Sequence, residues 1–486
     1  MENVNAYYTV SALVFFVLLL VIGFLLSRRH RSESTHDFAV ASRQLGAPRL
    51  VLMNIATYLS AVSLIGFTGY GYASGFAMIS FFFGTILGHF PLALVSKKLH
   101  QWHVSSIPEF VGARYKSYSM RAWFGMVFVA IYTLYLMLNL VGVGVLLNSV
   151  AGLPVWLSEL IILVALIGYV ALGGMRVTSL INSVQAVVIL VVVLLGAGIA
   201  VATAGGFGAL LDDVRAVDPT LLSATSDGAL TWSILLGTSM GWMAGVACRA
   251  DFGAQALSGK RARVAGWTLG LPGLAIIVVY LALNLIGLSA RTQLPKLANS
   301  DAAFPLFFSE IAPSWMGWIM IFALLSGITA ACDSYILTIS TIVSNDVIKP
   351  LMQRRGAAAD RTERVSVYGA RCTVLVAAAV AFVLSLADLP LLAVATLSLF
   401  VIWGSTCFVP LYGGLLWRRG SGRAALISSL VGVVLAVYWL NAPPFAPGAG
   451  AVIAIPVSLV VYVAISLASG RDADRPAPVP TPAVDV

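Results

Sequence analysis

The stretch TYLSAVSLIGFTGYG, residues 57–71, decides the fold. It lies inside an apolar segment, residues 50–72, but it carries Ser60, Ser63, Thr68 and three glycines. A continuous helix in lipid does not need so many small and polar residues. In membrane proteins, interrupted helices near the midplane expose backbone carbonyls and half-helix ends where the backbone lines a cavity. We therefore predict an interrupted helix here, and close packing of small residues is the alternative.

Twelve other apolar segments accompany this one. The 486 residues are 59% apolar and only 10% charged, whereas a soluble domain carries roughly 25% charged residues. About 20 apolar residues cross about 30 Å of hydrocarbon, so we predict an all-α polytopic membrane protein with about 13 transmembrane helices. The predicted spans are residues 7–27, 50–72, 76–96, 123–149, 154–172, 180–204, 230–248, 264–289, 314–346, 369–386, 389–417, 424–441 and 449–468.

The basic residues indicate the orientation of the chain. If the N-terminus is outside, 26 of the 29 lysines and arginines fall on the cytoplasmic side, as the positive-inside rule requires. We therefore predict a multi-pass protein of the plasma (inner) membrane with the N-terminus outside and the C-terminus cytoplasmic. The net charge of +9 is then explained by membrane lipid as a partner, and nucleic acid is not expected. The proline-rich residues 470–486 are predicted to form a disordered cytoplasmic tail.

The ninth span, residues 314–346, is longer than a plain span and carries a polar stripe. Ser326, Thr329 and Asp333 lie within about 60° of one another on a helix of 100° per residue. A carboxylate at membrane depth is costly and usually functional, so Asp333 is a candidate functional residue. A carboxylic acid that only hydrogen bonds to a neighbouring helix is the alternative.

Five stretches, in this order, resemble the sodium/solute symporter family, which includes the proline, pantothenate and sodium/galactose carriers. They are Ser60-Ala61 with Ile65-Gly66, SIPEF at 106–110 with Arg114-Tyr115, Gly173-Gly174-Met175 with Gln185, Asp333-Ser334 with Asp346, and VPLYG at 409–413. The resemblance covers about residues 38–420. It implies a LeuT-like inverted repeat of 5+5 helices plus peripheral helices. The implied parts are 1–28 (the N-out first helix), 49–204 (repeat 1), 230–417 (repeat 2) and 423–468 (spans twelve and thirteen).

The resemblance also implies a cation site between the broken second span and the ninth span. The backbone carbonyls of the family's sodium site fall at Ala56, Leu59 and Gly327, but its two hydroxyl positions fall on Ala330 and Ala331. Alanine offers no oxygen to a hard cation, so we expect the usual sodium site to be degraded. The coupling ion is then Na+ or H+, and no other cofactor is expected. The remaining polar groups of this candidate site are Asn182, Ser326, Thr329, Asp333 and Ser334.

The candidate solute site lies on spans two, three, four and seven. By resemblance to the sugar carriers, Phe82 stands where those proteins have an acidic residue. This disfavours a sugar and favours a small organic acid, an amino acid or a similar metabolite. The candidate set is Ser60, Ser63, Phe82, Thr85, Tyr132, Asn139 and Trp242, although aromatic residues at helical spacing also serve packing. His89 is expected to be a hydrogen-bonded core residue, with a proton carrier as the alternative. Arg249 is expected to be a cytoplasmic anchor, with binding of a substrate carboxylate as the alternative.

These features predict a secondary active transporter that moves a small solute by alternating access, driven by protons because the usual sodium site is degraded, or by the solute gradient alone. One alternative is a sodium-coupled symporter with a rebuilt cation site. Another is a solute sensor that has a transporter fold and does not transport. An enzyme is not expected, because the spans show no paired carboxylates, histidine cluster or Ser-His constellation.

Overall fold

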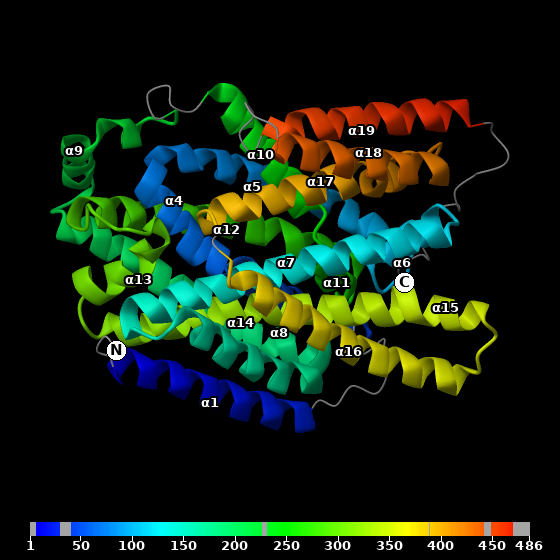
Figure 1. Cartoon of the computed structure of the whole chain (residues 1–486), viewed down its shortest axis with the longest axis horizontal. Helices are drawn as coiled ribbons and strands as arrows, with labels where there is room; N and C mark the ends of the chain where they lie inside the picture. Colours follow the sequence, from blue (N-terminus) through cyan, green and yellow to red (C-terminus); the bar gives the residue numbers. More distant parts are fainter. Residues whose placement is uncertain (1–5, 30–39, 226–230, 388, 442–448, 470–486) are drawn as a thin grey trace.

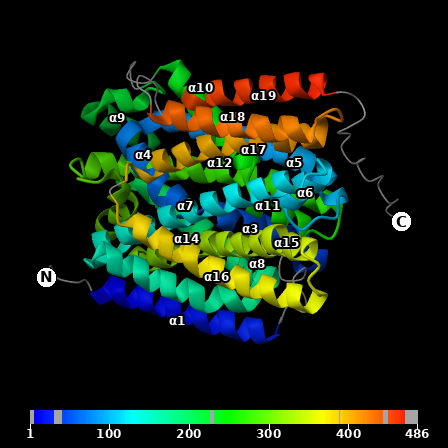
Figure 2. The same ribbon diagram turned by 45° about the vertical axis from the view of Figure 1, so that its right-hand side comes forward.

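The computed structural model describes residues 6–29, 40–225, 231–387, 389–441 and 449–469. Across these ranges the regular secondary structure is helical, so the all-α prediction is confirmed. Figures 1 and 2 show the helices side by side in one bundle, with α1 (Ala6–Arg29) on one flank and α18 (Gly422–Asn441) and α19 (Ala449–Ala468) on the opposite flank. The predicted tail, residues 470–486, and the first five residues of the chain lie outside the described residues.

The bundle has two ends, which we name after short helices found there. At the α13 end lie α4 (Phe67–Ser74), α9 (Phe207–Val217) and α13 (Ala303–Leu306) (Figure 1). At the α6 end lie α6 (Ile107–Arg114) and α15 (Lys349–Arg354). The same separation is visible after the rotation in Figure 2.

Local signals in the sequence place several helix ends. Ser106 caps α6 by accepting the N–H of Glu109 at 3.0 Å, and Ser117 caps α7 by accepting the N–H of Met120 at 3.2 Å. Gly152 ends α7 with a φ of 67°, which favours glycine.

The other elements are η1 (Ala41–Arg43), α3 (Ala47–Tyr58), η2 (Val62–Gly66), η3 (Gly75–Met78), α5 (Ile79–Gln101), α7 (Tyr118–Ala151), α8 (Val155–Thr203), η4 (Pro219–Leu222), α10 (Trp232–Ala247), α11 (Ala250–Leu257), α12 (Ala262–Gln293), η6 (Ser300–Ala302), η7 (Phe307–Ile311), α14 (Met316–Ile342), η8 (Val343–Ile348), α16 (Ala359–Ser385) and α17 (Leu392–Leu416).

The stretch 57–71 does contain a helix break, so that prediction is confirmed. α3 ends at Tyr58, and the backbone of the next residue, Leu59 (φ −81°, ψ 65°), leaves the helical region. The chain then continues through the π-helical turn η2 into α4. We call this interruption the first break.

The first break frees two backbone carbonyls. In a continuous helix, the N–H groups of Ser60 and Ala61 would bond to the carbonyls of Ala56 and Thr57. Here the N–H of Ser60 bonds to the carbonyl of Tyr58 at 3.0 Å, and the N–H of Ala61 bonds to Asn139 Oδ1 at 3.2 Å. The carbonyls of Ala56 and Thr57 therefore lose their usual helical donors.

A second break separates α10 from α11. Cys248 ends α10, and Arg249 takes an extended backbone conformation (φ −61°, ψ 116°) before α11 begins. The two breaks fall in the first helix of each predicted repeat. The division of the chain into repeats 49–204 and 230–417 stays a prediction.

Ten helices in the described ranges are long and apolar enough to cross a membrane, so the predicted number of spans is not confirmed. The span 50–72 is the broken helix, the spans 154–172 and 180–204 lie in one assigned helix, α8, and the span 230–248 is the 16-residue α10. A rule of about 20 apolar residues recognises separate continuous helices. Here one segment is interrupted, two are joined in a single helix and one is short. The number of spans expected from hydropathy therefore differs from the number of long apolar helices in the structure.

α14 is the most enclosed of the long helices. In the helical run Met316–Arg354, 89% of the residues in its apolar 18-residue stretch are buried, whereas in the corresponding stretch of α16 only 22% are buried. α14 contacts α3, α7, α8 and α16. Its polar stripe therefore faces protein, as an ionisable residue at membrane depth requires.

Candidate functional site between the two breaks

The hydroxyl group of Tyr58, the last residue of α3, joins four helices. It lies 3.0 Å from Thr85 Oγ1 on α5, and it accepts hydrogen bonds from Trp242 Nε1 on α10 (2.9 Å) and from the hydroxyl of Tyr280 on α12 (3.0 Å). All four side chains are buried. We call them the Tyr58 cluster. It ties the first break to three other helices of the bundle.

Three more predicted solute-site residues lie around the Tyr58 cluster. The ring centroids of Phe82 and Tyr280 are 5.7 Å apart, and the hydroxyl of Ser63 donates to the carbonyl of Tyr58 at 2.7 Å. The hydroxyl of Ser60 is buried and has no hydrogen-bond partner among the described residues. The structure thus brings Ser60, Ser63, Phe82, Thr85 and Trp242 together. Their role in binding a solute stays a prediction.

Tyr132 and Asn139, on α7, have other partners. The hydroxyl of Tyr132 donates to Asp251 Oδ1 at 2.6 Å and accepts the N–H of Asp251 at 2.9 Å. Asn139 accepts the N–H of Ala61 and donates to the carbonyl of Tyr135 at 2.9 Å. Tyr132 therefore positions the start of α11, and Asn139 holds the first break in its interrupted form.

The predicted cation site has two of its backbone groups side by side. A Cβ atom added to Gly327 on α14 would lie under 3.0 Å from the carbonyl oxygen of Leu59 at the first break. Only a residue without a side chain allows the two backbones to approach so closely. The structure therefore brings Leu59 and Gly327 together, as the sequence predicts.

The positions predicted for sodium-binding hydroxyls carry methyl groups. Ala330 and Ala331 are 0% exposed, and neither has an oxygen on its side chain. The carbonyl of Ala330 accepts hydrogen bonds from Asn182 Nδ2 (3.3 Å) and from the hydroxyl of Ser334 (3.1 Å). A cation at this position would receive no side-chain oxygen from either residue. The degraded sodium site stays a prediction.

The polar stripe of α14 is buried along its length. Ser326 is 3% exposed and Asp333 is 0% exposed. The hydroxyl of Thr329 accepts a hydrogen bond from Gln185 Nε2 on α8 at 3.0 Å. The stripe therefore lies against α8 at Thr329, inside the protein.

Ser334 faces α3. Its hydroxyl lies 3.0 Å from that of Thr57, and Thr57 Oγ1 accepts a hydrogen bond from Gln255 Nε2 at 3.1 Å. Ser334 is one helical turn beyond Ala330, in the direction of the α6 end. A pair of hydroxyl oxygens thus lies one turn away from the two alanines.

Arg249 and Asp251 form a buried ion pair at the second break. The side chain of Arg249 is 0% exposed and that of Asp251 is 1% exposed. Arg249 Nε lies 3.1 Å from Asp251 Oδ1, and Nη2 donates to Oδ2. The prediction that Arg249 is a cytoplasmic anchor is therefore wrong. The chain continues from the break into α11, and this keeps the arginine inside the bundle.

Four aromatic rings surround the guanidinium group of Arg249. Its central carbon is 3.9 Å from the ring centroid of Phe252, 5.5 Å from that of Tyr135, 5.7 Å from that of Tyr58 and 5.8 Å from that of Tyr335. Aromatic faces attract cations at these distances. Through the ring of Tyr58, the ion pair adjoins the Tyr58 cluster.

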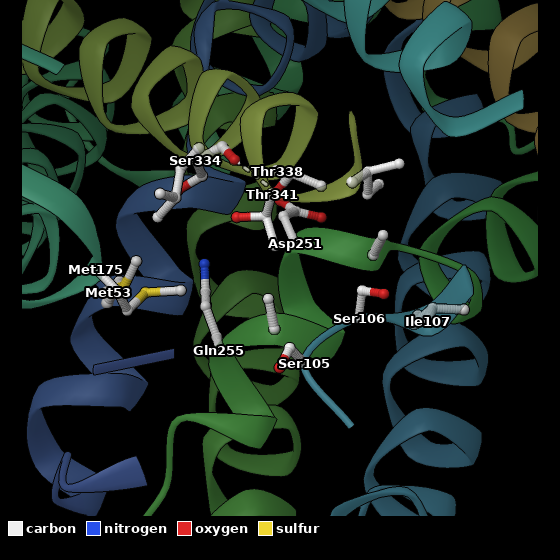
Figure 3. A pocket seen from close by; sticks show the side chains of 14 residues that line it. Met53, Ser105, Ser106, Ile107, Met175, Asp251, Gln255, Ser334, Thr338 and Thr341 are labelled. Carbon is white, nitrogen blue, oxygen red and sulfur yellow. Dashed lines mark hydrogen bonds between the residues drawn. The ribbon is translucent and has the colours of Figure 1, made fainter. Parts of the chain in front are cut away.

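A pocket lies on the α6 side of the ion pair (Figure 3). Figure 3 shows Ser334, Thr338 and Thr341 together on one wall, with Asp251 next to them and Gln255 below. Asp251 is the charged residue among the described lining residues. They are Met53, Ser105, Ser106, Ile107, Met175, Ala250, Asp251, Ala254, Gln255, Ser334, Leu337, Thr338, Thr341 and Ile342.

At the α13 end, Asp301 connects three elements. It lies in η6, its Oδ2 accepts the N–H of Leu392 at the start of α17 (3.0 Å), and a Cβ atom on Gly69 of α4 would lie 2.7 Å from its Oδ1. Burial raises the pKa of Asp301 to about 6, and the hydrogen bond from Leu392 opposes this shift in part. The side chain therefore holds its proton to a higher pH than an exposed aspartate does.

Comparison with known proteins identifies the family of this helical membrane protein. The model of the sodium:solute symporter family matches residues 38–432. The chain therefore belongs to the sodium:solute symporter family, whose members transport small solutes.

Individual relatives agree with this assignment. The chain is 24% identical over 441 residues to the sodium/pantothenate symporter of Escherichia coli (strain K12). This alignment covers 86% of this chain and 88% of the relative. The chain is also 24% identical over 447 residues to the high-affinity proline transporter PutP of Bacillus subtilis (strain 168), covering 87% and 90%. A solved structure of a Na+-coupled sialic acid symporter in a substrate-bound outward-open state superposes with a TM-score of 0.79 at 15% identity, covering 96% and 98% of the two chains. This similarity confirms the LeuT-like fold.

Sequence reasoning missed three central residues, Tyr58, Tyr280 and Asp251. The two tyrosines look like ordinary aromatic residues in apolar segments, and nothing local distinguishes them from packing residues. Asp251 could have been found, because an acidic residue two positions after Arg249 suggests an ion pair. The expectation for His89 is confirmed, because it is 1% exposed and its Nδ1 lies 3.0 Å from the carbonyl oxygen of Thr85.

Proposed function

We propose that this chain is a secondary active transporter that moves a small organic acid, amino acid or similar metabolite by alternating access. The observation that carries the proposal is the meeting of the two helix breaks at Tyr58 and Arg249. Helix breaks put unpaired backbone groups and half-helix ends at the centre of a carrier, where a solute and an ion bind. The predicted solute-site residues around the Tyr58 cluster support the same location.

The coupling ion in this proposal is the proton, and Asp333 is its carrier. Two facts support this choice: Ala330 and Ala331 provide no side-chain oxygen, and Asp333 is 0% exposed on the central helix α14. A buried carboxyl group that holds a proton leaves no net charge in the low-dielectric interior. Proton binding at Asp333 would therefore let the carrier change its conformation without moving a bare charge.

Uptake of labelled organic acids and amino acids into proteoliposomes tests this proposal. We expect uptake to be unchanged when sodium is replaced by choline, to follow an imposed pH gradient, and to lose that response in Asp333→Asn. Asp360→Asn is the matched control, because Asp360 is exposed at the start of α16. Strict sodium dependence of the natural protein would contradict proton coupling. Specific solute binding without uptake under any gradient would favour the sensor.

Sodium coupling at a rebuilt site is the second candidate, and the hydroxyl pair of Thr57 and Ser334 favours it. Hydroxyl oxygens are suitable ligands for a hard cation. If uptake requires sodium, Ser334→Ala and Thr57→Val should raise the sodium concentration for half-maximal uptake by roughly tenfold or more, as expected when a ligand to a charged group is lost. Thr338→Val, one turn further along α14, should change it much less. An equal effect of all three variants would argue against this site.

The predicted orientation belongs to the same proposal. The basic loops 97–121 and 349–371 contain α6 and α15, so both lie at the α6 end, which we assign to the cytoplasm. Single cysteines test this in a Cys372→Ser background, since Cys372 is an exposed thiol. A cysteine in place of Arg215 should react with an impermeant reagent from outside, and one in place of Lys260 only from inside. The reverse pattern would contradict the assignment.

A further inference from the structure

We propose that Arg249 binds a carboxylate group of the transported solute through its two terminal nitrogens, and that Asp251 is the internal carboxylate that occupies Arg249 in the empty carrier. This inference rests on the proposed transport function and names the chemical class of the solute. It makes the ion pair at the second break part of the solute site.

The guanidinium group of Arg249 is only partly used in the structure. The carboxylate of Asp251 accepts hydrogen bonds from Nε and Nη2, while Nη1 has no hydrogen-bond partner among the described residues. A buried donor without an acceptor is costly, so this nitrogen provides a free energy gain to any ligand that supplies an oxygen. The edge formed by Nη1 and Nη2 matches the spacing of two carboxylate oxygens, which is the geometry of a bidentate arginine-carboxylate pair.

The surroundings of Arg249 favour a carboxylate over a neutral group. The aromatic rings of Phe252, Tyr135, Tyr58 and Tyr335 exclude water, and this strengthens any ion pair formed there. They contribute no negative charge of their own at neutral pH. Among the described residues, Asp251 is the carboxylate that bonds to Arg249, so a second carboxylate competes only with Asp251.

Asp251 has another position available when a solute carboxylate arrives. Its Oδ1 is held by Arg249 Nε and by the hydroxyl of Tyr132, whereas its Oδ2 bonds to Nη2. If the solute takes Nη1 and Nη2, Asp251 keeps the contacts of Oδ1 and releases Oδ2. Asp251 also lines the pocket on the α6 side, together with Ser334 and Thr338 (Figure 3), so a released Oδ2 has open space and hydroxyl-bearing side chains close by.

A purely structural role explains less of this arrangement. A buried ion pair is weak evidence for stability, since replacing both partners together is often nearly neutral. This pair also lies in a helix break, between the Tyr58 cluster on one side and a pocket on the other. That position suits a charge that exchanges its partner during a transport cycle.

Binding to the purified full-length protein in lipid nanodiscs tests the inference without requiring transport. The probes are acetate, propionate and benzoate, each paired with its amide, and proline paired with prolinamide; binding is followed by the shift in melting temperature and by tryptophan fluorescence. At least one carboxylate should bind roughly tenfold or more tightly than its amide, as expected for hydrogen bonds to a charged group. Preference for proline over the simple acids would indicate that Asp251 also pairs with an ammonium group of the solute. Preference for the simple acids would indicate an anionic solute.

Three variants separate binding from folding. Arg249→Gln combined with Asp251→Asn removes both charges at once, so it should fold and lose the preference for carboxylates. Asp251→Asn alone leaves Arg249 without its internal partner. Carboxylate affinity should then rise, solute exchange in proteoliposomes should persist, and net uptake should fall because the empty carrier returns with an uncompensated charge. Arg261→Gln, an exposed arginine at the start of α12, is the control for loss of one positive charge.

The outcomes distinguish this inference from the proposed function. Equal binding of acids and amides, no binding of any carboxylate, or an unchanged preference in the double variant would overturn the role of Arg249. Transport of a neutral or cationic solute together with one of these results would leave the transporter assignment intact. Carboxylate binding that depends on Arg249, without uptake under any gradient, would support the site and reject transport.

Discussion

Substitution of Gly327 by alanine is a direct test of the contact between the first break and α14. The new Cβ would lie under 3.0 Å from the carbonyl oxygen of Leu59, and ordinary contacts begin at 3.4 Å. The atom in the way belongs to the backbone, so the break or α14 has to move by at least 0.4 Å. Overpacking of this kind costs about 1–3 kcal/mol. The gain from replacing glycine by alanine in a helix offsets up to about 1 kcal/mol of it.

We therefore expect Gly327→Ala to be less stable by up to about 2 kcal/mol, which is the overpacking cost less the gain from placing alanine in a helix. Thermal unfolding of the detergent-solubilised protein measures the change, and uptake at equal membrane abundance measures the functional effect. Uptake should fall even at equal membrane abundance of the folded protein, because the displaced carbonyl belongs to the proposed ion and solute region.

Gly198→Ala is the matched control for this experiment. Gly198 also lies in a long helix, α8, but a Cβ atom there would meet nothing within 4 Å. Its stability should be unchanged or raised by up to about 1 kcal/mol. Equal melting temperatures and equal uptake for Gly327→Ala and the natural protein would refute the close approach of Leu59 and Gly327.

Two further predictions concern Asp301 at the α13 end and the contact of Asn139 with the first break. Burial raises the pKa of Asp301 from 3.8 to about 6, so between these values the folded protein binds more protons at this side chain than the unfolded chain does. The contribution of Asp301 to stability is therefore fully present below about pH 4, and up to about 3 kcal/mol of it is lost as pH rises through 6. Asp301→Asn should flatten this dependence in melting curves from pH 4 to 7.5, and an unchanged slope would contradict the assignment. Asn139→Ala should destabilise the protein by about 1–3 kcal/mol, because the N–H of Ala61 loses its acceptor. Asn148→Ala, at an exposed position of the same helix, should have little effect, and similar losses in both variants would mean that the contact to the break is unimportant.

The fold could be predicted from sequence to the extent that its signals are local. Apolar segments of the length of a membrane span, the small and polar residues of 57–71, and the capping residues Ser106 and Ser117 each act within a few positions along the chain. The number of spans was less predictable. α10 is short because the chain breaks at Cys248, and the hydropathy of 230–248 contains no sign of where that helix stops being continuous.

The candidate site depended on tertiary structure. The proximity of Leu59 and Gly327 was expected by resemblance, because a helix break and a glycine are local features, and the structure has it. Their role as cation ligands stays a prediction. Arg249 was placed at the membrane surface, because a basic residue after an apolar segment usually marks its cytoplasmic end. Only the packing of α11 back into the bundle shows that it is 0% exposed and paired with Asp251.

What the sequence by itself determined is an all-helical membrane protein of the sodium:solute symporter family with a broken second span and two alanines where hydroxyls are expected. What only the tertiary structure decided is which distant side chains meet. Tyr58 and Tyr280 are 222 positions apart and share a hydrogen bond. The physical reason is that helix formation and membrane insertion respond to short windows of sequence. A hydrogen bond between two helices depends on the packing of the whole bundle, and no window of sequence contains that information.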